Sequence, residues 1–262
     1  IGMEYLYLDK FDEARLNFAK CLEVDYEDYS SLYNVIYCFD MQNQHTEAIE
    51  YLNNYINKDP YSEVAWHQLG RQYFILNNFE EALRAFDYAV LIDEYFVGGY
   101  LEKAKTLENL ERYEEAIENY KATCELDDPT SFAYLRIGEC YKKLQLYQLA
   151  IKYYKKAVHE DPLLDKGWIA ITNLKLKQQK YKKALYTINK AIEIDDQNPV
   201  YWRKYAKINL KLNAYEEAIH AFNKCIELND LSLEIWLGLS DVLCYIGEYE
   251  AALKNLLKAT VY

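Results

Sequence analysis

The sequence predicts an all-α solenoid of about eight tandem helix–turn–helix units of 34 residues, with the first and last units incomplete. The main observation is a constant step of 34 residues between eight alanines: Ala14, Ala48, Ala82, Ala116, Ala150, Ala184, Ala218 and Ala252. Large apolar residues keep the same step, and all four tryptophans stand sixteen residues before one of these alanines. Such columns place equivalent packing groups in every copy of one structural unit.

Residues 63–96 show how one unit forms two helices. The first apolar stripe has the i, i+3, i+4, i+7 spacing of a helix and consists of Trp66, Leu69, Gly70 and Tyr73. A second stripe runs from Phe79 to Val90. Asn77 lies between the stripes, where the other units place Asn43, Asn213 or Gly247, which are residue types that tolerate the left-handed conformation at helix ends.

Two units carry the fullest set of residues at these positions. They are Trp66–Leu69–Gly70–Tyr73 with Ala82, Phe86 and Ala89, and Tyr134–Ile137–Gly138–Tyr141 with Ala150, Tyr154, Ala157 and Pro162. The pattern resembles the tetratricopeptide repeat (TPR), and the resemblance covers the whole chain. It implies a right-handed superhelix whose concave surface is lined by the first helix of each unit. It also implies a role in binding proteins or peptides, without naming the ligand.

The predicted domain organisation is a single array over residues 1–262. Its units are approximately 1–28, 29–62, 63–96, 97–130, 131–164, 165–198, 199–232 and 233–262. Unit 97–130 departs most, because Gly98 and Gly99 stand where its first helix should begin. We expect these glycines to mark a late helix start, since glycine inside a helix costs about 1 kcal/mol relative to alanine. A hinge within the array is the alternative.

Charge is distributed unevenly along the chain, whose net charge is −12. Residues 1–130 carry 10 basic and 27 acidic side chains, residues 131–212 carry 17 basic and 7 acidic, and residues 213–262 carry 3 basic and 8 acidic. A basic segment inside an acidic protein distinguishes this array from a generic one. Solvated surface lysine is the plain alternative to a functional interpretation.

The face of each first helix that lies opposite its apolar stripe is expected to be free for binding. At about 100° per residue, this face in the three basic units holds Phe132, Arg136, Glu139, Lys143, Lys166, Ala170, Asn173, Lys177, Val200, Lys204, Lys207 and Lys211. Arg203 shares the last of these helices, which has no acidic residue between Pro199 and Leu212. A bound anionic ligand would compensate this concentration of positive charge.

We therefore predict ligand contacts on the first helices. The candidate ligand-binding residues are Asn34, Tyr37, His67, Arg71, Lys105, Arg136, Lys143, Asn173, Lys177, Arg203, Lys207 and Lys211. Apolar contact area is expected from Tyr37, Phe132, Leu135, Ile169 and Leu176. The cations would favour acidic side chains of the ligand.

Motifs of enzymes and metal sites are not found. The sequence has no GxGxxG, GxxxxGK[ST], GxSxG or HExxH, and its four histidines lie in four different units. Recurrent acidic pairs such as Glu114 and Glu115 stand at helix starts, where carboxylates suit the helix dipole. We expect no catalytic residues, no metal and no cofactor.

The six cysteines form no CxxC pair, and we expect them to be small buried hydrophobes. Cys21 and Cys225 share a column with several alanines, among them Ala89 and Ala157. Free thiols fit a cytoplasmic protein. No apolar run approaches the roughly 20 residues that a membrane span needs. Because the chain starts inside a repeat, we expect the natural N-terminus to lie upstream.

These observations favour a non-enzymatic scaffold that holds a peptide or partner protein, acidic in character, in its concave groove. The alternative is a structural array that self-assembles through its oppositely charged segments or its terminal repeats, where Leu253, Leu256 and Leu257 would be partly uncovered. Nucleic acid is a weaker choice, since the net charge opposes it.

Overall fold

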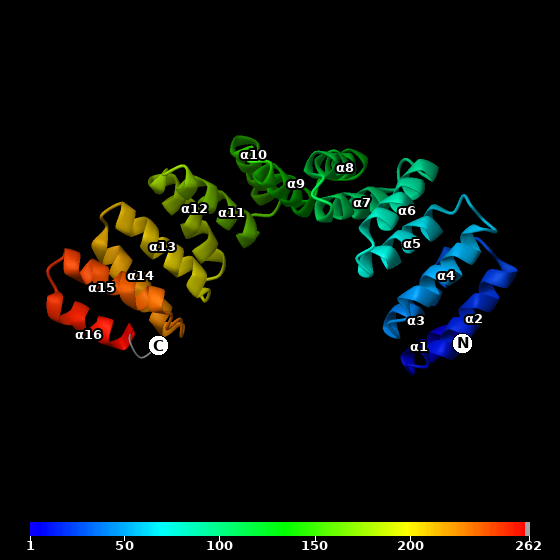
Figure 1. The fold of residues 1–262 in the computed structure, drawn as a ribbon, viewed down its shortest axis with the longest axis horizontal. Helices are drawn as coiled ribbons and strands as arrows, with labels where there is room; N and C mark the ends of the chain where they lie inside the picture. The colour runs from blue at the N-terminus through cyan, green and yellow to red at the C-terminus, as the bar shows by residue number, and fades with distance from the viewer. Residues whose placement is uncertain (260–262) are drawn as a thin grey trace. The chain divides into compact units, whose positions relative to one another are not determined.

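The computed structural model describes residues 1–259, in which sixteen α-helices and no strands follow one another (Figure 1). Their contacts group them into two compact units, unit 1 from Ile1 to Pro129 and unit 2 from Thr130 onward. Within each unit a helix packs mainly on the helices before and after it in the chain. The prediction of an all-α solenoid of tandem helical repeats is confirmed, while the single array over 1–262 stays a prediction.

Unit 1 contains four pairs of helices, of which the first has a short opening member. The helices are α1 (Gly2–Tyr7), α2 (Phe11–Val24), α3 (Tyr29–Met41), α4 (His45–Ile56), α5 (Glu63–Ile75), α6 (Phe79–Ile92), α7 (Val97–Asn109) and α8 (Tyr113–Leu126).

Unit 2 also contains four pairs. They are α9 (Ser131–Lys143), α10 (Tyr147–Glu160), α11 (Asp165–Lys177), α12 (Tyr181–Ile194), α13 (Pro199–Lys211), α14 (Tyr215–Glu227), α15 (Leu233–Tyr245) and α16 (Tyr249–Ala259). Odd-numbered helices are the first helices of their repeats, and even-numbered helices are the second helices.

The alanine column lies in the core of both units. All eight alanines are at most 1% exposed, as expected for the point where the two helices of a pair come closest. Glycine allows the same close approach on the facing helix. A Cβ added to Gly70 would lie 2.6 Å from the Phe86 ring, and one added to Gly138 would lie 2.5 Å from the Tyr154 ring. Large side chains of the second helices therefore fill the space that these glycines leave.

Every first helix ends in the same left-handed corner. The corner residues repeat the step of 34 and have positive φ: Asp9, Asn43, Asn77, Glu111, Gln145, Gln179, Asn213 and Gly247. At each corner the next backbone N–H donates to the carbonyl five residues earlier, for example Asn78 to Tyr73 at 2.9 Å. The prediction for the asparagines and Gly247 is confirmed.

The late helix start predicted at Gly98 and Gly99 is wrong. Helix α7 begins at Val97, the same repeat position at which α5 begins with Glu63. A Cβ on Gly99 would lie 2.7 Å from Cγ1 of Val90 on α6. Glycine stands here because the helix start approaches its neighbour closely. The hinge alternative stays a prediction.

The expected burial of the cysteines holds for only part of the set. All six thiols are free; Cys38, Cys140 and Cys225 are buried, whereas Cys21 and Cys244 are exposed. The Cys225 thiol lies 3.5 Å from the carbonyl of Pro199, the first residue of α13. Among residues 1–259 no helix has the length and apolar character needed to cross a bilayer.

Candidate binding surface on the first helices

Side-chain bridges join the first helices α11, α13 and α15 of unit 2. Lys204 Nζ on α13 donates to Asn173 Oδ1 on α11 at 2.9 Å. On the other side, Arg203 Nη1 donates to Glu234 Oε2 on α15 at 3.1 Å. The exposed side chains of these three helices form what we call the first-helix face of unit 2: Lys166, Asn173, Lys177, Val200, Lys207, Lys211, Leu233, Glu234, Leu237, Asp241, Cys244 and Tyr245.

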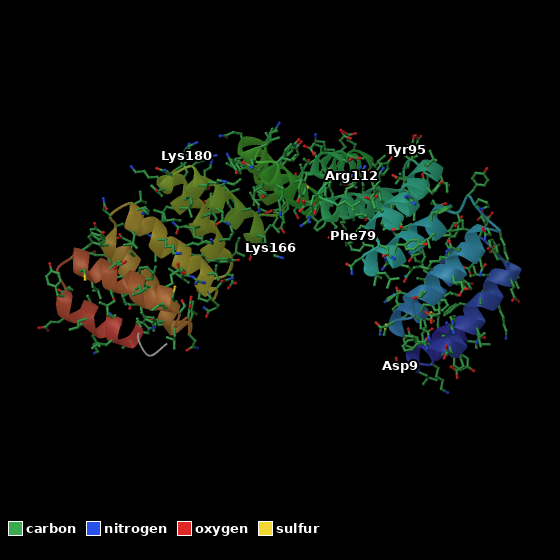
Figure 2. The ribbon with its side chains drawn as sticks, viewed as in Figure 1. Asp9, Phe79, Tyr95, Arg112, Lys166 and Lys180 are labelled. Carbon is green, nitrogen blue, oxygen red and sulfur yellow. The ribbon has the colours of Figure 1, made fainter. Side chains whose placement is uncertain are left out.

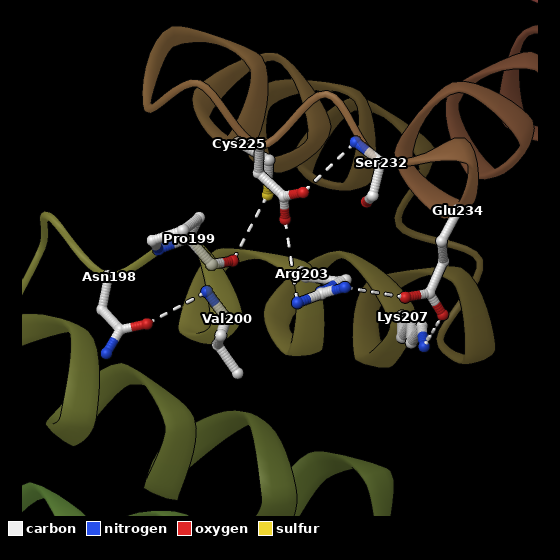
Figure 3. Close-up of polar contacts among 9 residues, drawn as sticks. Asn198, Pro199, Val200, Arg203, Lys207, Cys225, Ser232 and Glu234 are labelled. Carbon is white, nitrogen blue, oxygen red and sulfur yellow. Dashed lines mark hydrogen bonds and ion pairs between the residues drawn. The ribbon is translucent and has the colours of Figure 1, made fainter. Parts of the chain in front are cut away.

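Arg203 is the centre of a small ionic network on this face (Figure 3). Its guanidinium lies between two carboxylates, with Nη2 3.8 Å from Asp230 Oδ2 and Nη1 3.1 Å from Glu234. Lys207 also forms an ion pair with Glu234. The hydrogen bond from Lys207, followed by that from Arg203, holds the pKa of Glu234 below its usual range.

This network changes the interpretation of the basic helix α13. The sequence suggested that a ligand compensates its positive charge, because the helix itself has no acidic residue. The structure supplies compensation for Arg203 and Lys207 from Glu234, 27 to 31 residues farther along the chain. The first helix of the preceding repeat, α11, instead presents an amide, Asn173, to Lys204. The cations of α13 therefore divide into paired and unpaired groups.

Three exposed lysines of the first helices in unit 2 remain available to a ligand. Lys143 ends α9, Lys166 is the second residue of α11 (Figure 2) and Lys211 ends α13. Within residues 1–259 none of the three forms an ion pair. Lys177 is exposed but engaged, because it lies 4.2 Å from the centre of the Tyr147 ring and donates a hydrogen bond to its hydroxyl. Burial lowers the pKa of Lys204, with Lys207 and Arg203 as further causes.

The apolar contacts differ from the predicted set. Leu135, Ile169 and Leu176 are half-buried and pack against the hydrophobic core, and Ala170 is buried. The apolar side chains that do lie exposed on first helices of unit 2 include Phe132, Val200, Leu233 and Leu237, each between 41% and 51% exposed. Arg136 on α9 is half-buried.

In unit 1 the predicted contacts lie on α3, α5 and α7. Tyr37 is 48% exposed, and Asn34 bonds to the carbonyl of Ser30 on its own helix. Arg71 donates to Gln68 at 3.2 Å, and Lys105 forms an ion pair with Glu102 at 2.7 Å. The unit 1 cations are thus held by polar neighbours on their own helices. Their role as ligand contacts stays a prediction.

His67 on α5 is buried rather than presented on the open face. Its ring is 9% exposed and lies against the rings of Phe86 and Phe96, with centroids 5.7 and 5.1 Å away. Neither ring nitrogen has a hydrogen-bond partner within the described chain. Burial, reinforced by the charge of Arg71, lowers the pKa of His67 to about 4. The ring is therefore neutral at pH 7.

Sequence reasoning missed Glu234, which lies at the position occupied by Val200 and Lys166 in the two preceding repeats. The signal was present in the step of 34 residues: a residue on one first helix faces the same region of the next first helix. Aligning the repeats by that step places Glu234 beside the cations of α13. A single-helix search for charge compensation could not find it.

Comparisons with known proteins agree with this architecture. Sequence models of the tetratricopeptide repeat match residues 1–63, 97–129, 131–162 and 201–230, together more than half of the chain. No curated protein matches the chain.

Several solved structures share the fold. The C-terminal part of a TPR repeat-containing protein from Cytophaga hutchinsonii superposes with a TM-score of 0.71, at 19% identity over 87% of this chain and 91% of that one. YrrB, a TPR protein with an unusual peptide-binding site, has a TM-score of 0.59, at 16% identity over 70% of this chain and 95% of that one. MamA from Desulfovibrio magneticus RS-1 also has a TM-score of 0.59, at 18% identity over 65% and 96% of the two chains. With its repeat columns, helix pairs and matched segments, the chain belongs to the tetratricopeptide-repeat family.

Proposed function

We propose that this protein is a non-enzymatic scaffold that binds an acidic peptide segment on the first-helix face of unit 2. The observation that carries the proposal is the combination of unpaired lysines and exposed apolar side chains on neighbouring helices. Lys166 and Lys211 supply charge, while Val200, Leu233 and Leu237 supply contact area. YrrB, which shares the fold, is described as having a peptide-binding site.

The Arg203–Lys207–Glu234 network gives the face a second means of holding an acidic residue. A ligand carboxylate that approaches Lys207 or Arg203 can replace Glu234, whose side chain is exposed and can turn toward solvent. Because one ion pair is exchanged for another, this contact adds less affinity than an unpaired lysine does. Two or three charged contacts with one apolar anchor correspond to a dissociation constant on the order of micromolar.

The proposal is tested by selecting ligands without prior bias. A displayed library of random 12-residue peptides is panned on the protein, and the strongest binder is synthesised with a fluorophore. We expect enriched sequences to contain acidic residues spaced around one or two large apolar residues. Binding measured by fluorescence anisotropy should weaken as salt rises from 50 to 300 mM, because the exposed charges are screened.

Charge reversal then locates the site. Lys211→Glu and Lys166→Glu should each weaken binding of the selected peptide by about tenfold. Lys254→Glu on α16, which makes the same charge change at an exposed second-helix position, is the matched control and should have little effect. A peptide whose affinity ignores both Lys211→Glu and Lys166→Glu would remove this face from the function.

A second candidate is self-association, which exposed apolar side chains on α16 favour. Leu253 and Leu257 are 59% and 61% exposed, and Leu256 is 39% exposed. Opposite net charges of the two units offer another mode of contact between molecules. Light scattering across protein and salt concentrations distinguishes the two modes of self-association, because association through apolar contact strengthens with salt, whereas association through charge pairing weakens. A monomer under all conditions rules out both modes.

A further inference from the structure

A pocket of about 600 Å³ lies among α10, α11 and α12 of unit 2, apart from the side chains of the first-helix face. Four lysines line it: Lys155 on α10, Lys175 on α11, and Lys182 and Lys183 on α12. None of the described residues that line the pocket is acidic. Within residues 1–259 none of these four lysines forms an ion pair or a side-chain hydrogen bond. The pocket therefore concentrates uncompensated positive charge.

The interior of the pocket is lined by buried, mostly apolar side chains. Val158 and Ile171 are 6% and 1% exposed, and Thr187 is fixed by a 2.8 Å hydrogen bond to Thr172. One wall is aromatic. The Trp168 indole N–H donates to the Pro162 carbonyl at 3.0 Å, which fixes the ring, and Tyr186 meets it edge-on with centroids 6.5 Å apart. Tyr186 is 60% exposed, so its ring is open to a ligand.

The repeats provide an internal comparison for Lys182 and Lys183. The same two positions hold Glu80 and Glu81 in α6, and equally a pair of glutamates in α8 and in α14. These positions form the first turn of a second helix, where the helix dipole favours negative charge and disfavours positive charge. Two lysines at this point of α12 oppose the local preference of the fold.

Lys175 departs from its column in the same way. The equivalent positions hold large apolar or aromatic residues in six repeats, Tyr5, Phe39, Tyr73, Leu107, Tyr141 and Leu243, and an amide, Asn209, in the seventh. Lys175 is half-buried, and burial, followed by the charges of Lys180, Lys155 and Lys183, lowers its pKa. Three of the four lysines thus replace residues that the repeat would use for stability, and no side chain of the described protein compensates them.

We propose that this pocket binds a small ligand that carries two or more phosphate groups close together, next to a flat ring that lies against Trp168 and Tyr186. Clustered phosphates match the site because they deliver several negative charges within a few ångströms, as four lysines around one small pocket require. A peptide would need several acidic side chains in the same volume. Lysine is a common phosphate ligand as a point charge, and an aromatic face adds stacking energy to any planar ring.

The experiment uses the whole chain and measures its affinity for two probes, ATP and tripolyphosphate, by titration calorimetry in the absence of Mg²⁺. ATP supplies charge and a ring, whereas tripolyphosphate supplies charge alone. We expect both to bind to the wild-type protein and ATP to bind at least fivefold more tightly. The Trp168→Leu variant should reduce ATP affinity to about that of tripolyphosphate.

The decisive variant restores the residues that other repeats carry. Lys182→Glu with Lys183→Glu should raise the melting temperature of the unliganded protein, because it restores the favourable helix start, yet weaken ATP binding by more than tenfold. Lys175→Leu should likewise raise the melting temperature and weaken ATP binding. The control is Lys166→Glu with Lys211→Glu, an equal charge change on the first-helix face, which should change ATP affinity less than twofold.

These variants separate the two proposals, since Lys166→Glu with Lys211→Glu should weaken only peptide binding and Lys182→Glu with Lys183→Glu should weaken only ATP binding. A folded Lys182→Glu/Lys183→Glu protein with wild-type ATP affinity would overturn the phosphate site. Equal affinity for ATP and tripolyphosphate would overturn the role of the aromatic wall. Binding of single-stranded RNA through the same lysines, with neither small probe bound, would replace the small ligand by a nucleic acid.

Discussion

Units 1 and 2 are built from the same repeat but differ in the chemistry that the repeat carries. Both bury the alanine column and both end their first helices in left-handed corners. Unit 1 has 10 basic and 27 acidic residues, whereas unit 2 has 20 basic and 15 acidic. The comparison shows that a small set of columns determines the fold, while the positions between the columns are left to determine charge and binding.

The burial of histidine differs between the units, and we expect it to give the largest effect on stability, a fall in the free energy of unfolding at low pH. In unit 1 the pKa of His67 is about 4, below its usual 6.5, so folding holds the ring neutral. The contribution of neutral His67 to the free energy of unfolding is fully present above pH 6.5 and is lost as the pH falls toward 4. The reason is that the His67 ring binds a proton more readily in the unfolded chain than in the folded protein. The full loss is roughly 3 kcal/mol, of which about 2 kcal/mol falls between pH 7 and pH 5.

Urea unfolding at pH 7 and pH 5 measures this loss. The His67→Phe variant should show a smaller decrease than the wild-type protein, by about 2 kcal/mol. The control His159→Phe changes an exposed ring in unit 2 and keeps His67, so it should retain the wild-type decrease. Hydrogen exchange at pH 5 should locate the weakening in α5 to α7. Equal decreases in the wild-type protein and His67→Phe would show that the ring is not held neutral by burial.

The glycines under aromatic rings provide a test on which the two units should agree. Gly70→Ala and Gly138→Ala each place a methyl group inside van der Waals contact of a buried ring. Overpacking costs about 1–3 kcal/mol, and the better helix propensity of alanine returns about 1 kcal/mol. We expect a net loss of up to about 2 kcal/mol in both variants by urea unfolding.

A compensating change sharpens that test. In the same columns another repeat has Ile36 on the first helix and Leu52 on the second, both buried, so this repeat combines a larger residue on the first helix with a smaller one on the second. Adding Phe86→Leu to Gly70→Ala should therefore cost less than the two changes separately. Strict additivity, or a loss confined to one unit, would show that the units do not share this packing rule.

The corner residues should also respond equally in the two units. Glu111 in unit 1 and Gln145 in unit 2 have φ of 57° and 60°, a conformation that disfavours side chains with a Cβ. Glu111→Gly and Gln145→Gly should each raise the free energy of unfolding by about 0.5–1 kcal/mol. Glu118→Gly, within helix α8, should lower it by about 1 kcal/mol instead. Corner glycines that destabilise either unit would contradict the strain argument.

The smallest effect is expected at the ionic network around Arg203 in unit 2. Glu234→Gln removes the ion pairs to Arg203 and Lys207. Because the Glu234 and Lys207 side chains are exposed and Arg203 is half-buried, the free energy of unfolding should fall by only about 0.2–1 kcal/mol. The freed cations should strengthen binding of an acidic peptide by a few fold. The control Glu227→Gln removes an exposed pair with Lys224 on α14 and should leave peptide binding unchanged.

The columns allowed the sequence to predict the repeat, the helix pairs and four of the corners. Glu111, Gln145 and Gln179 were not identified as corners because their residue types do not favour positive φ; only their position in the step of 34 places them there. Gly99 was misinterpreted because its residue type, unlike those of the missed corners, has a strong preference of its own. Glycine has a well-known effect on helix stability, but here it serves the contact with Val90, which depends on the neighbouring helix.

The candidate site was less predictable than the fold. Charge counts located the basic segment but not the division of its lysines between Glu234, Tyr147 and solvent, because each partner belongs to another helix. His67 was expected near the open face from its place on α5, whereas Phe96 from the following connection covers it. Contacts between repeats decide both outcomes, and one helix considered alone does not contain them.

The recurrence of one corner at every first helix has a consequence for how such chains change over generations. Each corner is a junction of the same geometry, so a gene segment copied or deleted in whole multiples of 34 residues joins one junction to another like it. A duplicated repeat meets neighbours it already fits. Evolution can thus lengthen the protein without inventing a connection, and then alter the surface of the new copy while its parent keeps the original function.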